Sequence, residues 1–280
     1  MAGLRARLEE KRHMEFAILD PPPLIADSVK AIWRARGSKA EFDSPEPIVP
    51  DGCVEIVFNL GDRFINADTG TLQPRDLLAG QMTRPVVALP TGDVDLIGVR
   101  FKTGRAGAAL RIPMWELQNQ LIAASDVIPG VDRLADDLRN VADSDRLSYL
   151  ERALAPKLYK IDGRSMHGVD EALAIIDNTR GSIAIETLAR RVGITRRHLE
   201  RQFREYVGLR AKHVARIARI HSALDLLQRQ PAMSGAEIAA ECGYSDQSHL
   251  VRECQELAGQ TPQRLKTTER SLAGLMREAV

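Results

Sequence analysis

The chain has 280 residues with a formal net charge of +1; 44% of the residues are hydrophobic and 28% are charged. This composition is typical of a soluble globular protein with one large or two ordinary domains. The near-neutral charge gives no global argument for a nucleic-acid or membrane partner, so any electrostatic footprint must be local. No run approaches the roughly 18 apolar residues of a membrane span, and residues 1–14 lack the apolar stretch of a signal peptide. We therefore expect a cytoplasmic protein without a membrane partner.

The residues offer little for catalysis or metal binding. The three cysteines, Cys53, Cys242 and Cys254, are odd in number and show no CxxC spacing, which argues against a disulfide framework and a zinc site. We expect reduced thiols in packed surroundings. No Ser/His/Asp set converges, and the run GRAGAAL at 104–110 lacks the lysine of a phosphate loop. The sequence therefore predicts no enzyme, no cofactor and no metal.

Two halves of the chain follow different patterns. Residues 15–110 are broken by Pro and Gly into short β-rich runs, at 29–35, 53–60, 62–68, 85–90 and 94–102. Such spacing predicts an antiparallel sheet or barrel. From Pro113 onward the pattern becomes helical, at 115–124, 131–142 and 145–161. The fold class is therefore α+β, with a barrel-like β-rich domain and trailing helices at 1–162, a linker at 163–168 and an all-α domain at 169–270.

The helices between 126 and 160 carry an apolar side that is a candidate dimer face. Its members are Leu134, Leu138, Leu147, Leu150, Leu154 and Leu158.

A short motif occurs twice in the C-terminal half. LARRVGIT at 188–195 matches IAAECGYS at 238–245. Leu188, Ala189 and Val192 lie on one helical face, Gly193 permits a left-handed turn, and Thr195 caps the next helix. This spacing predicts a helix-turn-helix, and a second copy fifty residues later makes the prediction more specific.

One helix at 210–228 should join the two units. About nineteen residues make a rod of roughly 28 Å, which can hold two reading helices near the roughly 34 Å spacing of successive major-groove faces. Its expected core positions are Val214, Ile217, His221, Leu224 and Leu227.

These segments resemble the AraC/XylS family of bacterial transcription regulators. The likeness is carried by residues 185–209, 216–227, 236–254 and 259–266, which include the stretches GYSDQSHL and TPQRLK. It implies two helix-turn-helix units and double-stranded promoter DNA as partner. It also admits a small-molecule effector, RNA polymerase and a second copy of the chain as partners.

The first half resembles an uncharacterised domain that precedes this DNA-binding unit in part of the family. The likeness lies at 50–62, 79–85 and 97–117. By analogy we interpret it as a sensing or dimerising domain.

A helical wheel separates the reading face of the first unit from its core. With Leu199 inward, Phe203 and Tyr206 fall on the same side. Arg197, Glu200, Arg201 and Arg204 stand opposite. Arginine can hold guanine O6 and N7 together or a phosphate, and glutamate can accept from cytosine. Eight bases against Glu200 and Glu205 between 194 and 219 provide the local footprint.

The second unit is less basic. With Leu250, Cys254 and Leu257 inward, Asp246 takes the capping position and Glu253 turns toward the core. Between 225 and 258 only Arg229 and Arg252 oppose six acids. We expect the first unit to dominate affinity. The outward positions are Ser248, Val251, Arg252 and Gln255. The predicted DNA-binding set is Arg196, Arg197, Glu200, Arg201, Arg204, Gln247, Ser248, His249 and Arg252; by resemblance, the base-reading positions are all of these except Arg196 and Arg204.

Two other functions remain open. One is an enzyme with a DNA-binding attachment, such as a DNA-repair alkyl transferase, which needs an activated cysteine. Cys53 lies in an apolar strand and is a poor candidate. The other is a protein-interaction module whose helix-turn-helix no longer docks on DNA.

Overall fold

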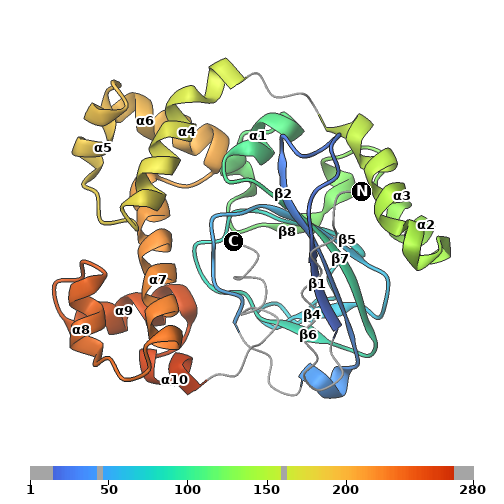
Figure 1. The fold of residues 1–280 in the computed structure, drawn as a ribbon. Coiled ribbons are helices and arrows are strands. Elements are labelled where there is room, and N and C mark those ends of the chain that lie inside the picture. The colour runs from blue at the N-terminus through green and yellow to red at the C-terminus, as the bar shows by residue number, and fades with distance from the viewer. Residues whose placement is uncertain (1–14, 43–46, 159–162, 268–280) are drawn as a thin grey trace.

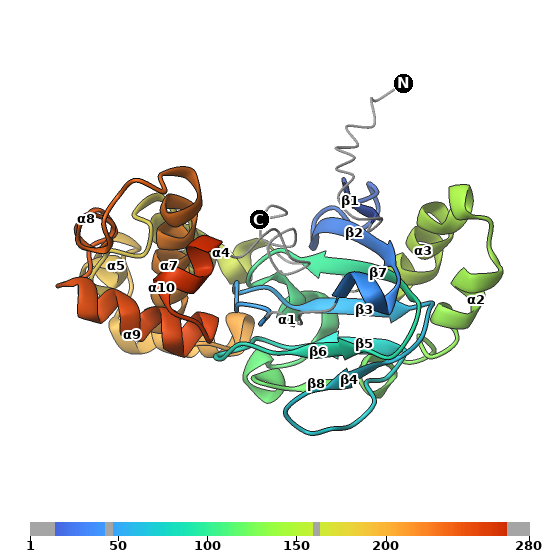
Figure 2. The ribbon, with the colours of Figure 1, turned by 90° about the horizontal axis from the view of Figure 1, so that it is seen from below.

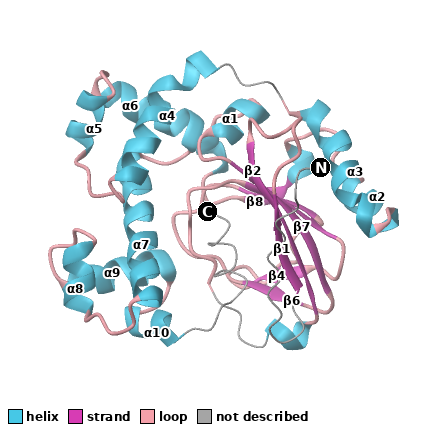
Figure 3. Cartoon of the chain, in the orientation of Figure 1, coloured by secondary structure: helices cyan, strands magenta, loops and turns pink. Residues whose placement is uncertain are grey.

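The computed structural model describes residues 15–42, 47–158 and 163–267. It shows a β-rich lobe with a few covering helices and a second lobe made of helices (Figures 1 and 3). The α+β class and the order of the two parts are as predicted. None of the described helices is long and apolar enough to cross a membrane.

The β-rich lobe contains a six-stranded antiparallel sheet in the order β1-β2-β7-β3-β5-β8. Its strands are β1 (Glu15–Leu19), β2 (Val29–Gly37), β3 (Glu55–Asn59), β5 (Asp76–Ala79), β7 (Val94–Phe101) and β8 (Leu121–Ala123). A second sheet pairs β4 (Phe64–Asn66) with β6 (Ala88–Pro90). The large sheet does not close into the expected barrel. It stays open, because β1 and β8 are its edge strands and do not pair with each other in the described chain. The small sheet instead packs against one of its faces, through Phe64 and Ala88.

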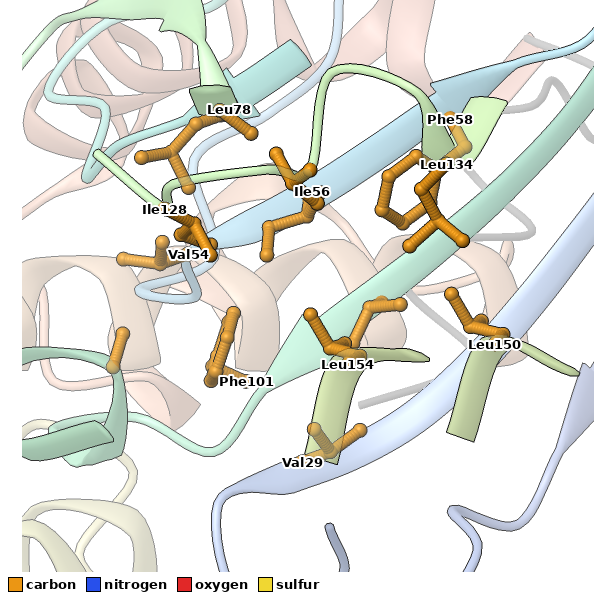
Figure 4. Close-up of a cluster of buried hydrophobic side chains, with 14 of the residues drawn as sticks. Val29, Val54, Ile56, Phe58, Leu78, Phe101, Ile128, Leu134, Leu150 and Leu154 are labelled. Atoms are coloured by element: carbon orange, nitrogen blue, oxygen red, sulfur yellow. The ribbon is translucent and has the colours of Figure 1, made fainter. Parts of the chain in front are cut away.

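The other face of the large sheet carries the main hydrophobic core. Alternation along β3 sends Ile56 and Phe58 to this face, where both are fully buried. Helices α1 (Arg105–Leu110), α2 (Leu134–Asn140) and α3 (Arg146–Leu154) cover it. Figure 4 shows Leu134, Leu150 and Leu154 of these helices facing the strand residues. Burial on this scale supplies most of the stability of such a domain.

The candidate dimer face is therefore wrong. Leu134, Leu138, Leu150 and Leu154 are at most 3% exposed and belong to the core of their own chain. Leu147 and Leu158 pack against the same core. The sheet supplies the apolar surface that a second subunit would otherwise have to provide.

The helix expected at 115–124 is also wrong. A short 3₁₀ helix, η2 (Met114–Leu117), is followed by β8, in which Leu121 and Ala123 pair with β5. The open edge of β5 satisfies the backbone of this segment, so tertiary pairing overrides the local helical pattern. Strands β1 and β5 were likewise not predicted. The other 3₁₀ helices are η1 (Lys39–Phe42), η3 (Ala124–Asp126), η4 (Asp143–Asp145) and η5 (Ala155–Lys157).

The helical lobe is built on one long helix. Its members are α4 (Gly163–Asn178), α5 (Ile185–Arg191), α6 (Arg196–Gln202), the π-helix η6 (Phe203–Val207), α7 (Ala211–Arg229), α8 (Gly235–Glu241), α9 (Gln247–Ala258) and α10 (Pro262–Thr267). The predicted linker at 163–168 is helical, since these residues begin α4. Residues 159–162 lie outside the described chain, and the domain boundary itself stays a prediction.

The 19-residue helix α7 belongs to two cores. Val214 and Ile217 pack with α4, α5 and α6, whereas Leu224 and Leu227 pack with α8 and α9. The burial of these four residues is as predicted. His221 is only half-buried and is not part of either core. Figure 1 shows α7 running between the two helix-turn-helix units.

Glycines form the turns of both units, as expected at Gly193. Gly193 and Gly243 have φ of +74° and +71°, the left-handed region that glycine enters without a steric penalty. Gly181, with φ of +70°, precedes the first unit and lies against α7. A Cβ there would stand 1.9 Å from the carbonyl oxygen of Ala215, whereas one on Gly193 would meet nothing within 4 Å.

We therefore expect Gly181→Ala and Gly193→Ala to differ in cost. Gly193→Ala should lower the free energy of unfolding by about 1–2 kcal/mol, the strain of a left-handed residue. Gly181→Ala should add roughly 1–3 kcal/mol for the steric clash with α7. Urea denaturation followed by circular dichroism measures both. Equal losses would contradict the close approach of the turn to α7.

Candidate DNA-binding interface

The turn of the first unit fixes the start of α6. Thr195 is its N-cap, and its hydroxyl oxygen accepts from the backbone N–H of His198 at 3.2 Å. Leu199 and Phe203 are fully buried, which orients the helix. The predicted cap and core positions are confirmed, so the opposite side of α6 faces outward.

The predicted reading residues of α6 lie mostly at the surface. Arg197 and Arg201 are exposed and Glu200 is half-buried. Arg201 has a guanidinium nitrogen 3.0 Å from His198 Nδ1. Arg196 forms an ion pair with Glu186 of α5, which ties α6 to the preceding helix. Arg197 and Arg201 therefore stand where a nucleic acid could reach them.

Arg204 has a different environment. It lies in the π-helix η6 that continues α6, and its guanidinium carbon is 5.0 Å from the centre of the Trp115 ring of η2. The backbones are close here, because a Cβ on Gly208 would stand 2.6 Å from the carbonyl oxygen of Met114. The segment that continues α6 thus rests on the β-rich lobe.

The basic footprint between 194 and 219 is smaller than the sequence suggested. Arg216 pairs with Glu253 at 2.8 Å and also with Glu256. Arg219 donates to the carbonyl oxygen of Gly181 at 2.8 Å and lies over the ring of Tyr244. With Arg196, three of the eight bases hold the domain together. Arg197, Arg201, Arg210 and Lys212 remain exposed, as does Arg204.

Both helices of the second unit, α8 and α9, have a side-chain N-cap. Ser234 and Glu237 form a capping box at α8: the Ser234 N–H donates to Glu237 Oε2 at 2.7 Å, and the Glu237 N–H donates to Ser234 Oγ at 3.2 Å. Asp246 accepts from the backbone N–H of His249 at 2.8 Å at the start of α9. That backbone hydrogen bond is the main cause that lowers the pKa of the Asp246 carboxyl. The predicted capping role of Asp246 is confirmed.

Glu253 points away from the reading face, as predicted. Its side chain is 9% exposed and its partner is Arg216 of α7, an ion pair the sequence did not reveal. Asp246 at the N-cap and Glu253 within α9 are thus both engaged within the protein.

The predicted reading residues of α9 divide into two groups. Gln247, Ser248 and Arg252 are exposed. His249 is half-buried: its ring meets that of Tyr244 edge-on at 5.2 Å, and its Nδ1 lies 3.2 Å from Ser245 Oγ. His249 therefore helps to hold the turn, and contact with bases by any of these residues stays a prediction.

Contacts with the β-rich lobe were not found from the sequence. His221 Nε2 donates to the carbonyl oxygen of Pro50 at 2.8 Å, and Arg105 pairs with Asp170 at 2.8 Å. Figure 2 shows the two lobes side by side. No local pattern signals these contacts, because each joins residues far apart in the chain.

Two family models match the chain. Residues 188–268 match a helix-turn-helix domain, and residues 18–123 match a domain of unknown function. Residues 188–268 form an AraC-type helix-turn-helix domain. The two resemblances proposed from the sequence are thus both confirmed, each for its own half.

Individual relatives cover the AraC-type domain or the wider chain. The HTH-type transcriptional regulator GlxA of Rhizobium meliloti (strain 1021) is 38% identical over 79 residues, which are 28% of this chain and 24% of that protein. The chain thus spans about a quarter of the length of this relative. An AraC-type regulator structure from Chromobacterium violaceum is 25% identical, covering 38% of this chain and 94% of that one, with a TM-score of 0.35. ToxT of Vibrio cholerae O395 is 10% identical over 80% of this chain and 94% of that one, with a TM-score of 0.44.

The caps of the AraC-type domain give a stability prediction. Thr195→Ala should lower the free energy of unfolding by about 1 kcal/mol, because an amide of the first turn of α6 loses its acceptor. Asp246→Ala should also be destabilising, whereas Asp246→Asn keeps an oxygen acceptor and should be close to the parent. Urea denaturation compares the three. An Asn variant as unstable as the Ala variant would show that the charge, and not the cap, matters.

The contact between Arg204 and Trp115 gives a second prediction. If Arg204 contacts DNA, Trp115→Leu should tighten DNA binding by about two- to fivefold, since an exposed cation–π contact is worth about 0.5–1 kcal/mol. Fluorescence anisotropy with a labelled DNA fragment that the purified protein binds measures the change. The control is Arg204→Ala, in which Trp115→Leu should have no effect. A gain of the same size in that background would show that the contact is not the cause.

Proposed function

We propose that this protein is a sequence-specific regulator of transcription in bacteria, which binds double-stranded promoter DNA in the cytoplasm. The observation that carries the proposal is the pair of N-capped helices α6 and α9, set on the single helix α7 with their polar sides exposed. A reading helix in each of two successive major-groove faces is the arrangement that a rod of about 28 Å permits.

The exposed side chains suit this task. Arg197 and Arg201 can each hold a guanine edge or a phosphate, and Gln247 can pair with adenine. Ser248 and Arg252 complete a lighter surface on α9. Because Glu253 is paired with Arg216, it adds less repulsion toward a phosphate backbone than an unpaired acid would.

The first unit should carry most of the affinity. Replacing Arg197 or Arg201 with Ala is expected to cost about 1–3 kcal/mol at one base pair. Loss of either arginine should also flatten the dependence of affinity on salt more than Arg252→Ala does. Titrations at several salt concentrations measure both effects. Equal changes in the slope for all three variants would refute this ranking.

The function itself is tested by sequencing genomic fragments that the purified protein retains, with and without cell extract as a source of effector. A shared sequence motif among the fragments supports the proposal. Salt-dependent retention without any sequence preference, or no retention, would overturn it and favour a protein-interaction module.

The proposal includes a response to a small-molecule effector, sensed by the β-rich lobe. RNA polymerase and a second copy of the chain are further partners that such a regulator would use, although the leucines first considered for dimerisation are buried. An alkyl transferase is disfavoured, because Cys53 is 8% exposed and burial raises the pKa of its thiol to about 11. Little thiolate is then present near neutral pH.

A further inference from the structure

The β-rich lobe contains a partly open cavity of about 130 Å³. It lies on the face of the large sheet opposite the main core, where the small sheet and the segment before β3 cover it. Residues from both sheets form its wall, among them Trp33, Glu55, Val57, Asn59, Leu77 and Leu96.

The size and lining of the cavity limit what can occupy it. Most of its wall residues are aliphatic or aromatic. An engineered apolar cavity of roughly 150 Å³ binds benzene, so a space of this size accepts a ring or a short branched chain. A molecule that fills this space would therefore be small and mainly apolar.

The charged and unsatisfied groups that β3 presents to the cavity are acceptors, whereas the Trp33 indole and the Gln73 amide add donors to the wall. Glu55 and Asn59 point to the cavity from the same face of β3, since they are four residues apart on a strand. Asn59 is 5% exposed; its amide nitrogen donates to the carbonyl oxygen of Asp62 at 2.9 Å, and its Oδ1 has no hydrogen-bond partner in the described chain. Asp51 also lines the space, whereas no lysine or arginine does. The absence of a lysine or arginine among these described wall residues, beside two carboxylates, favours a ligand that presents donors.

Arg100 lies behind this wall and is fully buried. It is the cross-strand partner of Glu55, with its Nη1 3.0 Å from Glu55 Oε1, and it also pairs with Asp51. One arginine thus serves two carboxylates. Burial raises the pKa of the Glu55 carboxyl to about 7, although the neighbouring Trp33 indole opposes that rise. A cation in the cavity would favour the carboxylate of Glu55 and could lie against the indole ring.

We infer that this cavity binds a small, mainly apolar amine in its cationic form, and that its occupancy changes DNA affinity through the wall segment 49–51. The ammonium group is placed against Glu55 and Asn59, and the apolar part against Trp33 and Leu96.

The segment 49–51 connects the cavity with the helical lobe. Val49 lines the cavity and is also a member of the core formed by α7, α8 and α9. The carbonyl oxygen of Pro50 accepts from His221 of α7. Asp51 lines the cavity and pairs with Arg100. A ligand cation competes with Arg100 for these carboxylates, so the wall that holds α7 differs in energy between the empty and occupied states.

Binding is tested first on the full chain without DNA. Benzylamine, benzyl alcohol and benzoate have similar size and differ in charge. Calorimetry and thermal unfolding should show a dissociation constant for benzylamine that is at least about tenfold lower than that for benzyl alcohol. Benzoate should not bind. Equal binding of the three, preference for benzoate, or no saturable binding by any of them would overturn the inference.

Two variants locate the site. Glu55→Gln should remove the preference for benzylamine over benzyl alcohol. Ala79→Leu fills the cavity from β5 and should abolish binding of both. If Glu55→Gln fails to fold, the probe series on the parent chain and Ala79→Leu still decide. Unchanged benzylamine binding in Ala79→Leu would place the site elsewhere and overturn the assignment.

The effect on DNA affinity rests on the proposed function and is measured with a retained genomic fragment. Saturating benzylamine should change the dissociation constant of the parent chain at least about fivefold, the lower range of allosteric coupling. His221→Phe should bind benzylamine normally and lose this effect, whereas His213→Phe, on the same helix but beside Arg216 and Glu256, should keep it. An effect that persists in His221→Phe, or no effect in the parent, would overturn the coupling. Failure to retain any fragment would instead count against the proposed function, while binding of the probes is decided separately.

Discussion

Both helix-turn-helix units depend on one helix that is buried in two separate cores. The first half of α7 packs through Val214 and Ile217 with the first unit, and the second half packs through Leu224 and Leu227 with the second. Each unit is too small to bury a sizeable core alone. Because they share α7, the spacing and orientation of α6 and α9 are set by the packing of a rigid rod rather than by a flexible connection.

Charge in the helical lobe serves structure as much as recognition. Three arginines link segments of this lobe to one another: Arg196, Arg216 and Arg219. Glu253 forms an ion pair, and Asp246 caps a helix. A count of acids and bases along the chain therefore does not give the charge that each unit exposes, because some of these groups are paired within the protein. The exposed arginines of α6 and the mostly neutral surface of α9 are what remain after these internal interactions are satisfied.

Two of the contacts between the lobes differ in their chemistry. Near α6, a close backbone approach at Gly208 lets Trp115 lie on Arg204. Near the middle of α7, the chain before β3 contributes Val49 to a helical core and Pro50 to a hydrogen bond with His221. Val49 and Pro50 of the second contact also line the cavity. The same residues therefore form part of the cavity wall and contact the helical lobe.

The sequence alone determined the features that depend on neighbouring residues. The repeated turn glycines, the caps Thr195 and Asp246, the inward leucines and the helix joining the units follow from local sterics and helical periodicity, and the structure bears them out. Tertiary structure decided what depends on distant partners. The segment at 121–123 became a strand because β5 offered an open edge, and the leucines of α2 and α3 became a core because a sheet face lay beneath them. The pairing of Arg216 with Glu253, and the cavity beside Glu55, join residues far apart in the chain, which no local pattern encodes.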